Sequence, residues 1–273
     1  ILSRNHKRNF LDFEVIKNKK INLFGWSKIK KQKQTVYYPI NINEIKEIIS
    51  QAKKLNKKIC FKGSAQSYYD MFLSKNNLVI DTKKLNNISE IDNKNNTIDV
   101  GAGVVVKDLI NFLSDKKYIF SSIPGTYKAT IGGMISTNCH GKDSINGNFG
   151  NQISEIKVLY PNLEIKIITR KDKEFFHVIG GCGLLCLVLE AKIKLKKNLS
   201  FSNEIIKKTT TFENIDECLN LLENSNSYYT VAWVDCFSKN FRGAIEYGDW
   251  TQNYKKLKKL KYDKKNFIKK FIY

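Results

Sequence analysis

Apolar residues follow helical spacing in four short segments of the chain. In the first of them Ile45, Ile48 and Ala52 lie three or four positions apart, so they share one face of a helix. Asn43 stands where this helix would begin, and asparagine is a preferred N-cap residue. We predict helices over the segments 43–55, 107–113, 174–179 and 212–222.

Short runs of continuous or alternating apolar residues predict the strands. One pair of runs flanks Pro161 and Asn162, a dipeptide typical of turns, and this predicts a β-hairpin. We predict strands over the segments 58–61, 78–81, 97–100, 153–160, 164–169, 187–195 and 228–237. The mixture of short strands and helices indicates an α+β fold. The polar and basic segment 1–36 predicts no element.

The length of the chain, 273 residues, corresponds to about two domains. The register of apolar positions changes after Lys196-Lys-Asn198. We therefore predict a first domain over residues 1–198 and a second over residues 199–273.

Lysine dominates the charge of the chain. The sequence has 47 Lys and Arg against 26 Asp and Glu, a net charge of +21, which is typical of proteins that bind nucleic acids or anionic membranes. Only four of these residues are Arg, the side chain that makes bidentate contacts to phosphates and bases, and the lysines are spread over the whole chain. We expect no nucleic-acid partner. The segment 255–270 has nine lysines among apolar residues; this pattern fits a membrane-docking patch and equally a solvated chain end.

Cysteine, histidine and the apolar runs exclude other classes. The six cysteines and three histidines do not have zinc-site spacing, so we expect no metal. The longest apolar runs, such as 184–189, are far shorter than the ~20 residues of a membrane span. The first residues lack the apolar stretch of a signal peptide. These features predict reduced thiols and a cytoplasmic location, with peripheral membrane contact at most.

Glycine clusters near positions 63, 125–150 and 180–183 are the candidate binding loops. Glycine lets the backbone approach a ligand, and consecutive N–H groups in such turns bind phosphates. In Thr130-Ile-Gly-Gly-Met134 a helix would begin, and its free N–H groups would face a phosphate. The alternative for each cluster is a simple tight turn. Neither G-x-G-x-x-G after a first strand nor a P-loop is present, which disfavours Rossmann and P-loop sites.

Four ordered motifs resemble the flavin-dependent oxidases that have a vanillyl-alcohol-oxidase-type, or PCMH-type, FAD domain. The resemblance runs from about Phe24 onward, and its strongest parts are Pro124–Lys142, Gly147–Gly150, Gly180–Leu184 and Trp233–Asp235. It implies a two-subdomain FAD-binding domain followed by the start of an α+β substrate domain, an antiparallel sheet with helices. Family members continue well past position 273, so the resemblance also implies that the chain is the N-terminal part of an enzyme.

The resemblance implies roles for individual residues. Lys142 matches a lysine that faces the substrate, and Tyr68 matches a tyrosine that lines the same cavity. The first FAD loop matches Phe61, Lys62, Gly63, Ser64, Ala65, Gln66, Ser67, Tyr68, Tyr69, Asp70 and Met71. The second FAD-binding stretch and a later strand match Pro124, Gly125, Thr126, Thr130, Ile131, Gly132, Gly133, Thr137, Asn138, Cys139, His140, Gly141, Gly183 and Val188.

The first loop departs from the family pattern, Gly-x-Gly-(Arg or His)-Ser-Tyr-Gly-Asp. Ala65 and Tyr69 replace glycines, which is costly if either position needs a positive φ. Gln66 replaces the histidine through which some relatives bind FAD covalently. We therefore expect non-covalent FAD.

The implied reaction is oxidation of a secondary alcohol of a sugar, by transfer of a hydride to flavin N5. A polyprenyl-phosphate pentose is one candidate substrate, and the electron acceptor is not identified. Lys142 would orient a hydroxyl or stabilise the reduced flavin; its alternative is a solvated surface lysine. His140 would shape the flavin site; its alternative is a hydrogen-bonded core histidine. Two other functions stay open: a sugar-lactone or alcohol oxidase that uses oxygen, and a basic protein that binds nucleic acid or lipid.

Overall fold

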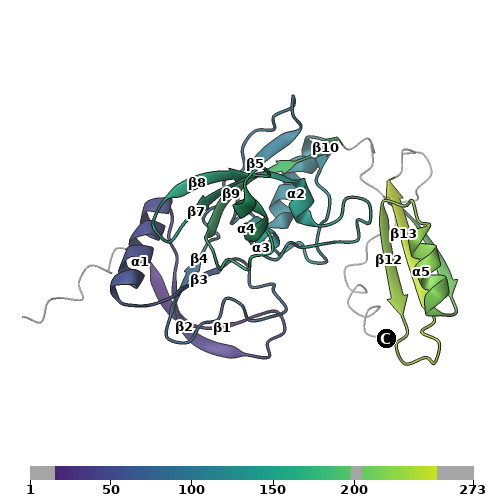
Figure 1. Ribbon diagram of the computed structural model, residues 1–273, viewed down its shortest axis with the longest axis horizontal. Helices are drawn as coiled ribbons and strands as arrows, with labels where there is room; N and C mark the ends of the chain where they lie inside the picture. The colour runs from purple at the N-terminus through teal and green to yellow at the C-terminus, as the bar shows by residue number, and fades with distance from the viewer. Residues whose placement is uncertain (1–15, 198–204, 251–273) are drawn as a thin grey trace, which may run out of the picture. The chain divides into compact units, whose positions relative to one another are not determined.

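The computed structural model describes residues 16–197 and 205–250, which form two compact units (Figure 1). The chain divides between Lys197 and Asn198. The lysine-rich segment 255–270 lies outside the described residues. We describe each unit by itself.

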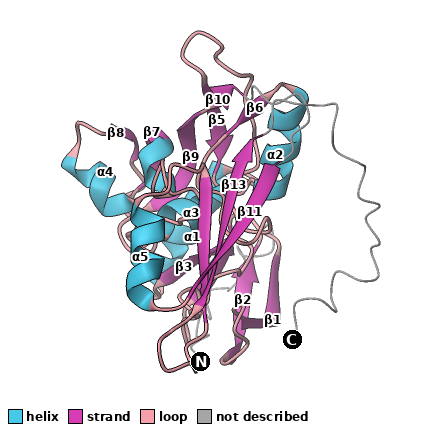
Figure 2. Ribbon diagram, turned by 90° about the vertical axis from the view of Figure 1, so that its right-hand side faces the viewer, coloured by secondary structure: helices cyan, strands magenta, loops and turns pink. Residues whose placement is uncertain are grey.

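The first sheet of unit one contains four strands in the order β1-β2-β4-β3. Its strands are β1 (Asn18–Phe24), β2 (Lys31–Tyr37), β3 (Ile59–Lys62) and β4 (Leu78–Asp81). The hairpin of β1 and β2 (Figure 2) is antiparallel, whereas β4 runs parallel to both β2 and β3. The parallel pairing places the ends of β3 and β4 side by side, so the loops that follow these two strands begin at the same edge of the sheet.

The second sheet of unit one is antiparallel, with the order β5-β9-β7-β8. Its strands are β5 (Thr97–Gly101), β7 (Ile153–Leu159), β8 (Ile165–Thr169) and β9 (Leu187–Lys194). The main core lies between this sheet and α2 (Val106–Asp115), α3 (Ile131–Ser136) and α4 (Lys173–Val178). The short strands β6 (Tyr118–Ile119) and β10 (Lys196–Lys197) pair with each other. A 3₁₀ turn spans Phe149–Gln152.

Helix α1 (Ile42–Lys54) fills a second core with its apolar face. Ile45, Ile48 and Ala52 are buried, as their spacing predicts. The helix begins one residue before the predicted cap, so the prediction for Asn43 is wrong. Asn41 is the N-cap: its side chain accepts a hydrogen bond from the backbone N–H of Glu44 at 2.9 Å.

Unit two is a three-stranded antiparallel sheet with one helix. Strands β11 (Ile205–Phe212), β12 (Tyr229–Val234) and β13 (Gly243–Trp250) lie in the order β11-β13-β12. Helix α5 (Ile215–Glu223) packs its buried Cys218 against Phe212 and Ile245 of the sheet. Phe212 was predicted to begin this helix; instead it ends β11, and Asn214 caps the helix by accepting from the N–H of Glu217.

The structure confirms the α+β class. It also contains strands that the apolar pattern did not predict: β1, β2, β11 and β13, and the two-residue strands β6 and β10. The sequences of the four longer strands mix apolar residues with lysine, asparagine, threonine and glycine, so the alternation of apolar and polar residues is interrupted. No helix among the described residues is long and apolar enough to cross a membrane.

Candidate functional site

The first predicted loop leaves the sheet at the end of β3 and packs directly on the second predicted stretch. There is no room for a side chain at Gly63, since a Cβ there would clash with the hydroxyl group of Thr130. Farther along the loop, Thr126 Oγ1 donates to Gln66 Oε1 at 3.5 Å, and the Gln66 amide donates to the carbonyl of Ser64 at 3.1 Å. The two stretches therefore form one continuous surface.

The loop offers four consecutive backbone donors. The N–H groups of residues 64, 65, 66 and 67 have no acceptor among the described residues. Ala65 lies in the left-handed region, with φ +55°, whereas Tyr69 does not have a positive φ. Successive N–H groups around a left-handed residue form an anion-binding concavity. This arrangement fits a pyrophosphate, so the residues present suit the diphosphate of FAD.

The N-terminus of α3 does not offer the free donors that its sequence predicts. Ile131 N–H donates to the carbonyl of Val104, and Gly132 N–H donates to that of Ala102, at 2.9 and 2.8 Å. Gly133 N–H donates to Oγ1 of its own N-cap, Thr130, at 3.3 Å. These N–H groups are therefore not free to bind a phosphate, and that part of the prediction is wrong. Helix α3 does begin where predicted.

A buried ion pair fixes the beginning of the first loop. The Lys62 ammonium group lies 2.7 Å from a carboxylate oxygen of Asp81, at the end of the neighbouring strand, and it also donates to the carbonyl of Gly63 at 3.0 Å. Both side chains are about nine-tenths buried. Lys62 was predicted to contact the cofactor. In the structure its ammonium group instead pairs with Asp81, where β3 and β4 end side by side. Sequence reasoning missed Asp81, whose only signal is a carboxylate at the end of an apolar run.

The far end of the loop is attached to the turn between β1 and β2. Asp70 Oδ1 accepts from the N–H of Gly25 at 3.1 Å, and the carbonyl of Ser67 accepts from the N–H of Trp26 at 3.2 Å. The Tyr68 ring packs edge-to-face on the Trp26 ring, with centroids 5.1 Å apart. Tyr68 itself is exposed. Asp70 thus has a positioning role through Gly25, a residue that the sequence did not single out.

The third glycine cluster meets the other two around α3. Asn138 follows this helix with φ +45°, and its side-chain oxygen accepts from the N–H of Gly150 at 3.0 Å. The N–H groups of Gly180 and Cys182 donate to carbonyls of α3, at 2.9 and 2.8 Å. Gly183, with φ +71°, lies beside the Phe61 ring. The three clusters, far apart in sequence, are therefore neighbours in space, as the predicted site requires.

The side chains of His140 and Lys142 in the second stretch are both on the surface. His140 and Lys142 are exposed, which excludes the core-histidine alternative for His140. The loop that follows is held by Asp143, whose buried carboxylate accepts from the N–H groups of Ile145 and Asn146 at 3.1 and 2.8 Å. Lys142 therefore extends from a fixed loop, and its role toward a substrate stays a prediction.

The thiols near this region differ in their surroundings. Burial raises the pKa of the Cys186 thiol to about 11, and it also raises the pKa of Cys60. Cys182 is exposed, and all six cysteines are free thiols. In the described parts of the chain, no group of three Cys, His, Asp or Glu side chains is placed to hold a metal ion.

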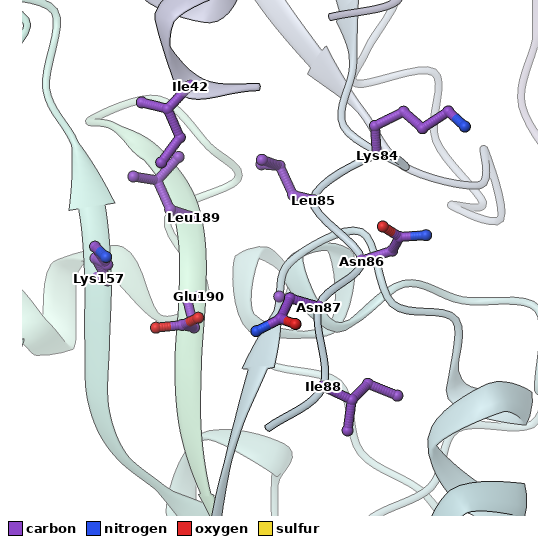
Figure 3. Close-up of a pocket in the computed structure, with 10 residues that line it drawn as sticks. Ile42, Lys84, Leu85, Asn86, Asn87, Ile88, Lys157, Leu189 and Glu190 are labelled. Carbon is purple, nitrogen blue, oxygen red and sulfur yellow. The ribbon is translucent and has the colours of Figure 1, made fainter. Parts of the chain in front are cut away.

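One hollow in unit one lies away from these loops (Figure 3). Its volume is about 520 Å³. It is lined by residues at the start of α1, by the segment that follows β4, and by residues of strands β7 and β9. Figure 3 shows Ile42, Leu85 and Leu189 gathered at one end and Lys84 directed away. None of the residues predicted to bind FAD lines it. A much smaller hollow is lined by Ser136, Gly183 and Val188.

Comparison with known proteins shows what this part of the chain is similar to. Residues 34–168 match the family described as "FAD binding domain". The chain is 28% identical over 202 residues to the decaprenylphosphoryl-beta-D-ribose oxidase of Mycolicibacterium smegmatis, which covers 71% of this chain and 44% of that protein. It is 24% identical to the D-arabinono-1,4-lactone oxidase of Candida glabrata, over 77% of this chain and 41% of that one.

A solved structure shows the same fold. The His121Ala mutant of cholesterol oxidase from Brevibacterium sterolicum superimposes with a TM-score of 0.71 at 14% identity, covering 87% of this chain and 49% of that one. The expected PCMH-type fold is thereby confirmed. The chain spans less than half the length of each of these three relatives.

Proposed function

We propose that the protein is a flavin-dependent oxidoreductase that oxidises a secondary alcohol of a sugar. The match of residues 34–168 to the family described as "FAD binding domain" supports the flavin cofactor. One relative is a decaprenylphosphoryl-beta-D-ribose oxidase and another a sugar-lactone oxidase, which supports a sugar-like CH–OH substrate. Bound FAD would supply the acceptor for the two electrons and the hydride of the carbinol C–H bond, and a base would take the hydroxyl proton.

The observation that carries the proposal is the run of four unpaired N–H groups at residues 64–67. They would hold the pyrophosphate, because preorganised backbone donors stabilise an anion without a cationic side chain. Gly63 and Thr130 keep this loop packed on the second stretch. Gln66 has no group that can bond covalently to the flavin, so the cofactor is held non-covalently.

On the substrate side, the proposal assigns Lys142 and Tyr68. Lys142 is an exposed cation on a loop fixed by Asp143, suited to orient a substrate hydroxyl or to balance negative charge on the reduced cofactor. Tyr68 holds its ring against Trp26 and keeps its hydroxyl accessible. Both would act by positioning, which brings the reacting C–H bond to the acceptor.

Flavin binding tests the proposal first. The purified chain, mixed with FAD and desalted, should retain visible flavin absorbance, and acid precipitation should release that flavin into the supernatant. A colourless protein that takes up no FAD would contradict the proposal and favour a basic binding protein. Flavin that stays with the acid pellet would contradict the role of Gln66.

Substrate tests follow on the flavin-loaded protein. Anaerobic bleaching of the flavin by a polyprenyl-phosphate pentose, but not by an aldonolactone, would support the sugar-alcohol substrate. Bleaching by the lactone alone, with rapid reoxidation by oxygen, would favour the lactone oxidase. Lys142→Ala should keep FAD and lose bleaching; full bleaching in this variant would remove Lys142 from the site.

A further inference from the structure

The hairpin of β1 and β2 carries a concentration of positive charge that differs from the rest of the chain. The segment 17–34 contains seven lysines and no Asp or Glu, whereas the whole chain has roughly one acid for every two bases. All seven are exposed, and none forms an ion pair with another described residue. They are Lys17, Lys19, Lys20, Lys28, Lys30, Lys31 and Lys33.

Exposed apolar side chains occupy the turn of the same hairpin. Ile29 is 88% exposed, Trp26 59% and Phe24 42%. The strand register pairs Phe24 with Lys31 and Asn22 with Lys33, and these four residues are all exposed. Buried residues such as Leu23 and Val36 alternate with them and fill the inner face. Apolar residues at the turn are therefore surrounded by lysines, with no acidic side chain on the hairpin.

We propose that this turn docks on an anionic membrane surface, with Phe24, Trp26 and Ile29 inserted among the headgroups and the lysines on lipid phosphates. Trp residues favour the membrane–water interface, and each lysine near an anionic leaflet adds to binding. Neither signal suffices by itself, since stable peripheral binding needs apolar insertion and charge together. The hairpin supplies both within one turn. The hairpin has no arginine, the side chain preferred for nucleic-acid recognition, and Ile29 cannot make hydrogen bonds to phosphates or bases.

The hydrogen bonds of the hairpin connect this docking surface to the flavin loop. Gly25 and Trp26 donate to Asp70 and Ser67, and the Trp26 ring packs on Tyr68. A membrane-bound turn would thus hold the loop that lines the predicted substrate cavity near the lipid surface. This consequence rests on the proposed function, whereas docking itself does not.

The test is flotation of the 273-residue chain, loaded with FAD, with lipid vesicles. We expect binding to phosphatidylcholine vesicles that contain about one third phosphatidylglycerol, and little binding to pure phosphatidylcholine. The triple variant Lys28→Gln, Lys30→Gln, Lys31→Gln should weaken partitioning by about tenfold or more. Ile29→Asn, which keeps the charge, should also weaken it. FAD content of each variant reports folding separately, so failure of docking and failure of the flavin site are distinguishable.

A matched control removes the same charge elsewhere on unit one, as Lys107→Gln, Lys171→Gln, Lys173→Gln; these lysines are also exposed. Equal loss in the control and the hairpin variant would overturn the proposal, because bulk charge would then explain binding. Undiminished flotation of the hairpin variants would overturn it as well. So would tighter, hairpin-dependent binding to a DNA duplex, which would indicate a nucleic-acid surface.

Discussion

At the scale of single residues, the loop at residues 61–71 contains a strained backbone position, Ala65, and a buried ion pair at Lys62. Ala65 occupies a left-handed conformation that disfavours any residue with a Cβ, where the family pattern has glycine. Lys62 begins the loop with an ammonium group that is nearly buried. The sequence identified Ala65 as a departure, but the ion pair of Lys62 depends on strand pairing between residues far apart in sequence.

Ala65→Gly should stabilise the protein. Relief of the left-handed strain, of about 1–2 kcal/mol, exceeds the added backbone entropy of glycine, of about 0.5–1 kcal/mol. We expect the free energy of unfolding to rise by about 0.5–1 kcal/mol, measured by urea denaturation. Ala52→Gly, inside α1, is the control and should lower it by about 1 kcal/mol. Equal destabilisation by both changes would contradict the strain at Ala65.

Lys62→Met should destabilise the protein severely, because it leaves the buried Asp81 carboxylate without a cation. Loss of one partner of a buried pair costs about 3–5 kcal/mol, and the disturbed loop should also raise the Kd for FAD. Lys62→Arg should retain much of the stability and much of the FAD affinity, since it keeps the positive charge. The exposed pair of Lys207 and Glu246 offers the comparison: Lys207→Met should cost under about 1 kcal/mol. A Lys62→Met variant with unchanged FAD affinity would exclude the positioning role.

At the scale of elements, predictability follows how regular the apolar pattern of each element is. Helix α1 has apolar residues at helical spacing, the hairpin of β7 and β8 has apolar runs on both sides of a turn dipeptide, and both were predicted. Strands β1, β2, β11 and β13 were not, because lysines, threonines and glycines interrupt their apolar pattern. Helix ends depend on capping hydrogen bonds more than on apolar spacing, so Asn43 was chosen where Asn41 caps.

The capping hydrogen bond of Asn41 at the start of α1 can be tested by its effect on stability. Asn41→Ala removes the acceptor for the Glu44 N–H and should lower the free energy of unfolding by about 1 kcal/mol. Asn43→Ala, within the first turn, should change it by no more than about 0.5 kcal/mol in either direction. Thermal unfolding of the two variants, side by side, checks this. A larger effect at Asn43 would restore the original assignment.

At the scale of the whole molecule, the sequence identified which segments meet but not how each contributes. The clusters near 63, 125–150 and 180–183 do converge around α3. The N–H groups that lack an acceptor among the described residues, however, are those of residues 64–67. The first N–H groups of α3 already donate to the carbonyls of Val104 and Ala102. Those carbonyls follow β5, and no local pattern around Thr130 reveals their approach.

The division into two units predicts how FAD affects stability. On the proposed function FAD binds the folded first unit, so it should raise the unfolding temperature of that unit alone. Calorimetry should show one transition that shifts with FAD concentration and one, from unit two, that does not. Limited proteolysis, which follows each unit separately, is the check. A single transition that shifts as a whole would show that the two units unfold together.

Strands β11 and β12 form the two edges of the sheet of unit two; neither pairs with a further described strand, and the two edges are protected unequally. β11 carries Lys207 and Lys208, and charged side chains on an edge discourage pairing with foreign strands. β12, with the sequence Tyr-Thr-Val-Ala-Trp-Val, has no charge and no proline. Such a segment is a template for intermolecular β-pairing and for aggregation. The concentration at which this chain stays in solution therefore depends on whatever covers the edge of β12.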